Sequence, residues 1–410
     1  MLRRSSILSI SFLLVLALFA PTVKSQTTST YHIGISQTLE NGQLNPNYQN
    51  NGTKIGDNYY FDSLQSLREF QAAYNSIQQN NDSVILILYS DQEIPNPSDV
   101  GDFYSIWSSL LVKNVTIRSG DGTLKKISTP EGDPVNADFL RIDSNNGNQK
   151  VNLIIDKNIS IRAGSATEPN RYATSIFGGD FTAEGVTYQG GGSIFVTNAE
   201  NLRSAVHLNG ASFVENVANL PSNNAILSLN NITSVDLRNT NFIDNNAEWL
   251  VYVSKDLSDS SNVRIELGAT EGETESVLGS TTDNRGGIFL GGTGSGSYTV
   301  NISGNGDFRQ NQKIETNNGN YSLTINKTGL GTWFVAEEIT NQFNVQGSAT
   351  MNISAGILEM GGNSKIELHS GNNASLNLSG NSSLNMGDAA IFEVHGTTAN
   401  LTLNNNSTLN

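Results

Sequence analysis

The side chains best suited to metal binding or acid–base chemistry are four histidines, His32, His207, His369 and His395. They lie far apart along the chain, and none has a partner at the short spacing typical of a zinc site. His207 lies within an apolar run, which indicates a strand residue that faces outward. The sequence therefore predicts no metal site and no cofactor.

The chain also lacks the motifs of known serine hydrolases and polysaccharide enzymes. No G-x-S-x-G or G-D-S-G segment is present to hold a catalytic serine. Glycoside hydrolases need two carboxylates facing one groove, and there is no N-T-D, D-D or G-H-G pattern. The nearest segment, NTN at 239–241, lacks the acid. We therefore predict no catalytic residue; the alternative is that acids from distant coils meet in the fold.

Three further segments are interpreted as turns or loops. RSGDGT (118–123) and GGTGSGS (291–297) are rich in glycine, but neither has the helix or the lysine of a phosphate site. EGETE (271–275) is interpreted as an exposed acidic loop, with calcium binding as the alternative. The many N-x-S/T sequons, which would carry glycans in a eukaryotic secreted protein, follow here from the abundance of Asn, Ser and Thr.

Charge limits the classes of partner. The chain has 23 basic and 38 acidic residues, and removing Arg3, Arg4 and Lys24 with the segment 1–25 leaves 20 against 38, a net charge of −18. Nucleic acids and anionic lipids bind clustered cations, so neither is an expected partner. An acidic, well-solvated surface suits a protein outside the cell.

The N-terminus resembles a secretory signal. Arg3 and Arg4 precede an apolar run from Ile7 to Ala20, and Val23–Ser25 follows with the pattern of a cleavage site. This pattern predicts a signal peptide over residues 1–25. The apolar run within it is too short to form a membrane-spanning helix. Zero cysteine in an exported chain favours a bacterial protein that crosses the periplasm unfolded.

Residues 26–61 are polar and are predicted to be irregular. A capping residue at Asp62 or Ser63 then precedes an amphipathic pattern, which predicts a short helix. The apolar run SVILILY (83–89) follows at once and predicts a buried strand. We expect the helix to cover the open edge of a long sheet, so that 62–175 holds an N-terminal cap and the first coils.

The rest of the chain is a series of short apolar segments separated by Gly, Asn, Asp and Ser, which predict strands and turns. Strands are expected at 114–119, 151–156, 205–209, 225–229, 234–239, 249–254 and 263–267. HLNGASFVENVA (207–218) aligns without gaps with DLRNTNFIDNNA (236–247), so that Phe213 falls on Phe242. ATMNIS (349–354), ASLNLS (374–379) and ANLTLN (399–404) align with one another at a constant offset. YTVNIS (298–303) and YSLTIN (321–326) extend this alignment upstream, so that Val300 and Leu323 take the position of Met351, Leu376 and Leu401.

Such repeats predict the architecture. A period of this length that contains strands and no helix is typical of one coil of a parallel β-helix. We therefore predict an all-β fold, a right-handed parallel β-helix with repeats over 176–410. Asn352 and Asn377 take the same place in successive coils, where they either stack as an amide ladder or serve as turn residues.

The segment KTGLGTW…QGSATMNISAGILEMGG (327–362) resembles the autotransporter-associated β-strand repeat of Gram-negative passenger domains. The matching residues are Lys327, Thr328, Gly329, Gly331, Thr332, Trp333, Gly347, Ala355, Gly356, Ile357, Leu358 and Gly361. Trp333 replaces the usual aliphatic residue, and Ile357 lies where Thr is common. A looser likeness joins F-x-x-N at Phe213–Asn216, Phe242–Asn245 and Phe308–Asn311 to the repeats of chlamydial polymorphic outer-membrane proteins.

These resemblances imply a function. They imply a secreted or surface-displayed autotransporter passenger at the bacterial outer membrane, non-enzymatic, acting as an adhesin or a structural stalk. The implied partners are a host-cell surface or matrix protein or glycan, another copy of the chain, and an outer-membrane β-barrel translocator. Because no barrel strands follow the repeats, we expect a truncated passenger or an anchor on another chain. A carbohydrate-active β-helix enzyme, lyase or hydrolase, is the alternative.

Overall fold

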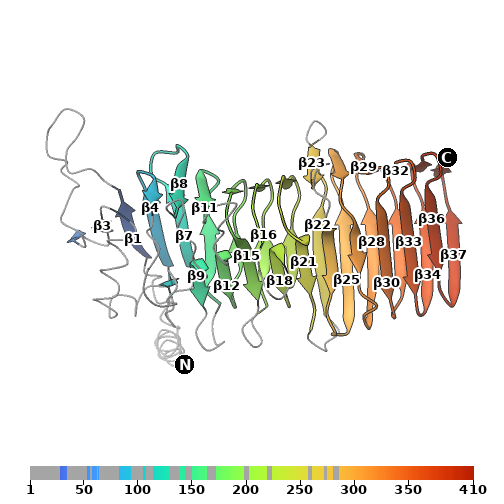
Figure 1. Ribbon diagram of the computed structural model, residues 1–410, viewed down its shortest axis with the longest axis horizontal. Coiled ribbons are helices and arrows are strands. Elements are labelled where there is room, and N and C mark those ends of the chain that lie inside the picture. The colour runs from blue at the N-terminus through green and yellow to red at the C-terminus, as the bar shows by residue number, and fades with distance from the viewer. Residues whose placement is uncertain are drawn as a thin grey trace, which may run out of the picture.

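A computed structural model describes residues 28–34, 53–55, 58–61, 63, 83–93, 105–107, 114–129, 138–143, 150–163, 172–197, 203–218, 224–256, 261–271, 275–279 and 286–410. The chain winds in coils of three strands, and successive coils stack along the long axis from β1 to β37 (Figure 1). Each strand pairs in parallel with its counterpart in the next coil, apart from one antiparallel pair at the N-terminal end. The parallel β-helix is confirmed.

Three sheets run along the rod. The first sheet holds β2 (Thr53–Ile55), β3 (Asn58–Phe61), β1 (Thr28–Ile33), β4 (Ser83–Leu88), β7 (Asn114–Ser119), β10 (Asn152–Ile155), β13 (Phe181–Thr182), β16 (Ala205–His207), β19 (Ser234–Asp236), β22 (Asn262–Leu267), β25 (Gly296–Ile302), β28 (Tyr321–Lys327), β31 (Ala349–Ile353), β34 (Asn373–Leu378) and β37 (Thr398–Leu403).

The second sheet holds β5 (Gln92–Glu93), β8 (Lys125–Ser128), β11 (Ile159–Arg162), β14 (Thr187–Gln189), β17 (Ser212–Val214), β20 (Asn241–Ile243), β23 (Glu275–Leu278), β26 (Asp307–Gln310), β29 (Thr332–Val335), β32 (Gly356–Met360), β35 (Ser382–Met386) and β38 (Thr408–Leu409). The third sheet holds β6 (Ser105–Trp107), β9 (Asp138–Asp143), β12 (Tyr172–Phe177), β15 (Ser193–Thr197), β18 (Ala225–Asn230), β21 (Trp249–Ser254), β24 (Gly286–Gly291), β27 (Ile314–Thr316), β30 (Thr340–Val345), β33 (Lys365–Ser370) and β36 (Ile391–His395).

Alternation along the strands explains the core. In β28 every second residue, from Tyr321 to Lys327, is buried, and the residues between them are partly exposed. Since strand side chains alternate in direction, the buried set fills the inside of the coil and the other set forms its outer face. Stacked rings run through the interior, with centroids 5.4 Å apart for Tyr188 and Phe213 and 4.9 Å apart for Phe213 and Phe242.

The N-terminal end differs from expectation. The segment 26–61, expected to be irregular, supplies β1, β2 and β3, and β1 pairs in register with β4. The run at 83–89 is therefore a strand as predicted, but it does not begin the sheet, because β1 and β3 lie beyond it. Its edge is covered by strands whose inward residues Tyr31, Ile33 and Phe61 continue the core. The expected helix and the signal peptide lie outside the described residues.

The register confirms the alignment of the three last segments, in which Met351 pairs with Leu376 and Leu376 with Leu401. It also confirms the repeat of the middle coils, and it corrects the alignment of the two segments that precede the last three. Phe213 pairs with Phe242, as the alignment of 207–218 with 236–247 predicts. In the C-terminal coils Val300 pairs with Ile325 rather than with Leu323, so the alignment of 298–303 with 321–326 is wrong by two positions. A shift of two keeps the same side chains inside, so the hydrophobic pattern alone does not distinguish the two registers.

The repeat-like segment 327–362 forms corners and strands of the stack. Gly329 has φ +84°, and a Cβ atom there would lie 2.2 Å from the carbonyl oxygen of Gly304 in the neighbouring coil. Only glycine allows two corners to approach so closely. Trp333 is fully buried, and its indole N–H donates to Oε1 of Gln310 at 2.9 Å. This partner explains how a tryptophan fits where an aliphatic residue is usual.

Of the two alternatives for Asn352 and Asn377, the amide ladder is confirmed, and it lies on the outer face of the first sheet. Nδ2 of Asn377 donates to Oδ1 of Asn352, Asn352 to Asn326 and Asn326 to Asn301, each at 2.9 Å. Asn301 then donates to Oε1 of Glu266 at 2.8 Å.

Among the described residues, no helix is long and apolar enough to cross a membrane.

Candidate functional site

Among the described residues, a compact group of histidine and acidic side chains lies on the outer face of the third sheet, on β33 and β36 beside β30. Because β33 and β36 pair in register, His369 lies directly beside His395 and Glu367 lies beside Glu393. Strand β30 continues both columns with Asn344 beside His369 and Gln342 beside Glu367. The sequence period thus brings together two histidines that are far apart along the chain.

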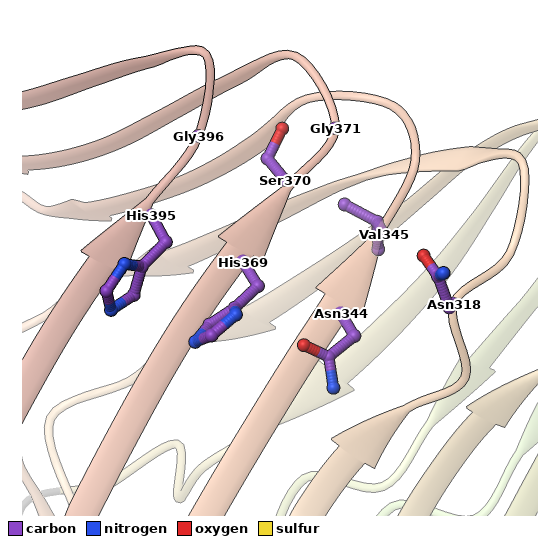
Figure 2. A pocket seen from close by; sticks show the side chains of 8 residues that line it. All are labelled: Asn318, Asn344, Val345, His369, Ser370, Gly371, His395 and Gly396. Carbon is purple, nitrogen blue, oxygen red and sulfur yellow. The ribbon is translucent and has the colours of Figure 1, made fainter.

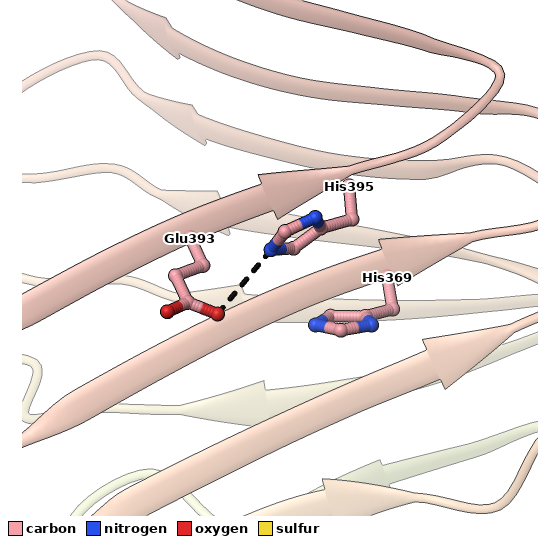
Figure 3. A group of neighbouring side chains, drawn as sticks. All are labelled: His369, Glu393 and His395. Carbon is pink, nitrogen blue, oxygen red and sulfur yellow. Dashed lines mark hydrogen bonds and ion pairs between the residues drawn. The ribbon is translucent and has the colours of Figure 1, made fainter.

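His369, Glu393 and His395 form a compact triangle, which we call the His–Glu triad (Figure 3). One ligand atom from each residue lies within 4.8 Å of the other two. Nε2 of His395 lies 3.3 Å from Oε2 of Glu393, and the centroids of the two imidazole rings are 4.5 Å apart. His369 and Glu393 are partly buried, whereas the His395 side chain is 57% exposed.

A lysine fixes the carboxylate of the triad. Nζ of Lys365 lies 3.1 Å from Oε1 of Glu393 and 2.5 Å from Oε1 of Glu367. Its hydrogen bonds hold the pKa of both carboxyls below their ordinary value. Glu393 therefore stays ionised. Its Oε1 atom contacts Lys365, and its Oε2 atom faces His395.

One ring nitrogen of the triad has no hydrogen-bond partner. Nε2 of His369 is buried from solvent, and no donor or acceptor among the described residues reaches it. Figure 3 shows a nitrogen of this ring on the side where Glu393 and the Nε2 atom of His395 lie. A buried polar atom without a partner costs free energy, about 1–3 kcal/mol, unless a ligand satisfies it.

His369 and His395 line an open depression of about 560 Å³, and Glu393 is not part of its lining (Figure 2). Figure 2 shows Asn344, His369 and His395 in a row along one side of it, their side chains pointing in the same direction. The corner residues Gly371 and Gly396 complete the rim. The two imidazole rings therefore border a space that a small ligand or ion can enter from solvent.

The other histidines lie elsewhere. The ring of His32 stacks on Tyr60 with centroids 4.8 Å apart, and its Nδ1 lies 3.1 Å from the hydroxyl of Tyr89. Burial lowers its pKa. His207 is half-buried on β16, where it pairs with Asp236 of β19 and faces outward as predicted. His369 and His395, which have no partner at short sequence spacing, are placed side by side by the pairing of β33 with β36.

The remaining candidate segments lie at the ends of strands or between strands. In 118–123, Oδ1 of Asp121 accepts hydrogen bonds from the backbone N–H and the hydroxyl of Thr123 and from the hydroxyl of Ser119. The segment 291–297 links β24 to β25. At 271–275, Glu275 is paired with Arg309 at 2.7 Å, and residues 272–274 lie outside the described part of the chain. Asn239 of the NTN segment lies in a turn with φ +57°.

The chemistry of the triad follows from its donors. Two imidazoles and one ionised carboxylate are ligands that suit zinc, copper and nickel ions. Comparisons of the chain with protein-family models, curated proteins and solved structures give no match.

Proposed function

We propose that this chain is the β-helical passenger of a secreted or surface-displayed bacterial protein, non-enzymatic, which adheres through its side faces or serves as a stalk. The observation that carries the proposal is the stack itself. Its sheets run the length of the rod and present columns of like polar side chains, such as Asn301, Asn326, Asn352 and Asn377.

Repeated columns favour binding through many weak contacts. Each outer position recurs about every 4.8 Å, so a partner that lies along the rod meets the same group several times. Weak contacts of this kind add up when they are linked, and many copies at a cell surface multiply them again. The signal-like N-terminus, the acidic balance and the autotransporter-like repeat support the same proposal.

The hydrolase form of the carbohydrate-active alternative needs one carboxyl whose pKa is raised, to act as the general acid. The two carboxyls aligned on the outer face of the third sheet, Glu367 and Glu393, share Lys365 and have lowered pKa values. This pair is better suited to holding a cation than to donating a proton.

A binding panel tests the proposal. The purified protein is applied to immobilised collagen, laminin and fibronectin, to a glycan array and to cultured epithelial cells, and its self-association is followed by sedimentation. We expect saturable binding to at least one surface or to itself, strengthened when the protein is presented in many copies on beads. Absence of binding in all arms would remove adhesion and leave the stalk role.

A further inference from the structure

We propose that His369, His395 and Glu393 bind one divalent transition-metal ion, of the zinc class, on the outer face of the third sheet. This site is independent of the proposed adhesion. It rests on three observations: the convergence of the ligand atoms, the partnerless buried nitrogen of His369, and the accessible depression beside it.

The spacing of the ligand atoms fits a tetrahedral ion. Zinc binds imidazole nitrogen and carboxylate oxygen at about 2.0–2.2 Å, which places two ligands of a tetrahedron about 3.4 Å apart. Nε2 of His395 and Oε2 of Glu393 lie 3.3 Å apart. The third ligand atom, from His369, lies within 4.8 Å of both, a distance that small side-chain rotations close.

The surroundings hold the ligands for a metal. Adjacent paired strands fix the backbones of His369 and His395, so both rings start on the same face at neighbouring positions. Lys365 binds Oε1 of Glu393, so that Oε2 remains available on the side of the histidines. Metal-bound carboxylates commonly have an outer partner of this kind. An ion here would satisfy Nε2 of His369, which has no partner among the described residues.

The donor set selects the class of ion. Imidazole nitrogen suits zinc, copper and nickel, whereas calcium and magnesium take mainly oxygen ligands. Three protein ligands leave a fourth position of the tetrahedron for water or for a group from another molecule, on the side where His395 is exposed.

Zinc titration by isothermal calorimetry tests the site with four variants. His369→Asn repeats the residue that Asn344 provides one coil earlier in the same column, so the fold tolerates it. His395→Asn changes an exposed residue. Glu393→Gln keeps the shape of the side chain, and His207→Asn, on the first sheet, is the matched control.

We expect one zinc per chain in the wild type and in His207→Asn, with nickel competing and calcium not. His369→Asn, His395→Asn and Glu393→Gln should each lower the affinity at least as much as loss of an outer partner does, roughly 10–100-fold, with the larger losses for the two histidines. X-ray absorption at the zinc edge should show only nitrogen and oxygen ligands, with the scattering of two imidazoles. Circular dichroism checks that each variant is folded.

Two results would overturn the site. One is a wild type that takes up no zinc. The other is uptake with the same affinity in His369→Asn and His395→Asn as in the wild type, which would place the ion elsewhere on the acidic surface. Because His395 is exposed, its variant remains informative even if His369→Asn fails to fold.

Discussion

Two pairs of stacked asparagines, one in the middle coils and one in the C-terminal coils, lie in opposite places. In the middle coils Asn216 and Asn245 are buried, and each donates to a main-chain carbonyl of the preceding coil: Tyr188 for the first at 2.9 Å, Phe213 for the second at 2.8 Å. In the C-terminal coils Asn326 and Asn352 lie on the outer face and bond to each other's side chains. The same residue type thus closes corners inside the stack and decorates its surface.

Stability and binding can therefore depend on different residues of the same coil. A buried amide that satisfies main-chain groups is costly to remove, whereas a partly exposed one exchanges its partner for water. The interior fixes the stack, and the outer columns are open to variation. The His–Glu triad occupies such outer positions.

Phe213→Ala should produce the largest effect on stability. The ring lies between Tyr188 and Phe242, so its removal leaves a cavity inside the stack. We expect a loss of about 3–5 kcal/mol in the free energy of unfolding, measured by urea titration. Phe334→Ala is the control, because this ring lies on the outer face of β29; a similar loss there would contradict the division between interior and surface.

The pH dependence of stability should reveal a buried charge in the C-terminal coils. Burial lowers the pKa of Lys327 to about 8, and its Nζ donates to the carbonyl of Gly329 at 3.0 Å. Between about pH 8 and the ordinary lysine pKa of about 10.4, the unfolded chain binds more protons than the folded one, so stability should rise with pH, by at most about 3 kcal/mol. Lys255, whose pKa is also lowered by burial, adds a change of the same sign.

Buried tyrosines reverse this trend above about pH 10. Burial raises the pKa of Tyr188, Tyr298 and Tyr321, so the unfolded chain loses protons first and stability falls. Urea midpoints measured from pH 7 to 11 should therefore pass through a maximum. Lys327→Met should reduce the rise between pH 8 and 10; an unchanged rise would mean that another group causes it.

Asn245→Ala should be clearly destabilising. It removes the donor to Phe213 and the Oδ1 acceptor for the backbone N–H of Asn216 at 3.0 Å. Leaving buried main-chain groups without partners should cost about 1–3 kcal/mol. Hydrogen exchange should show faster exchange at β17 and β20, and protection equal to the wild type would mean that the corner does not depend on this amide.

The smallest effect is expected for Asn352→Ala. Its side chain is partly exposed on the outer ladder, where water replaces the lost bonds to Asn326 and Asn377. We expect a change of about 0.5–1 kcal/mol in the same urea titration. A loss as large as that of Asn245→Ala would show that the outer ladder also holds the stack together.

The sequence pattern predicts the positions of the strands well, but it predicts less well which residues of adjacent strands pair. Alternating residues mark inward positions, as in β28 and β31, because burial follows the two-residue period. A register shift of two residues preserves this period, so the pattern does not reveal that Val300 pairs with Ile325. That pairing depends on the geometry of the corners. The strands of 28–61 escape prediction because they are short and lie in a segment that is otherwise rich in Asn and Gln.

The candidate site escapes prediction for a related reason. The separation of His369 from His395 is close to one repeat, the spacing that aligns Asn352 with Asn377, so the period itself is the signal that could pair them. Metal motifs are usually sought at spacings of a few residues, whereas a solenoid brings ligands together one coil apart. Glu393, two positions before His395, lies on the same face by strand alternation.

The central claim is that the interior holds the fold while the outer face carries binding. Zinc titration of Asn245→Ala beside His395→Asn, with the urea midpoint of each, tests it most directly. The account predicts that Asn245→Ala lowers the midpoint and keeps the zinc affinity, and that His395→Asn does the reverse. Loss of zinc binding in Asn245→Ala, or a lowered midpoint in metal-free His395→Asn, would contradict it.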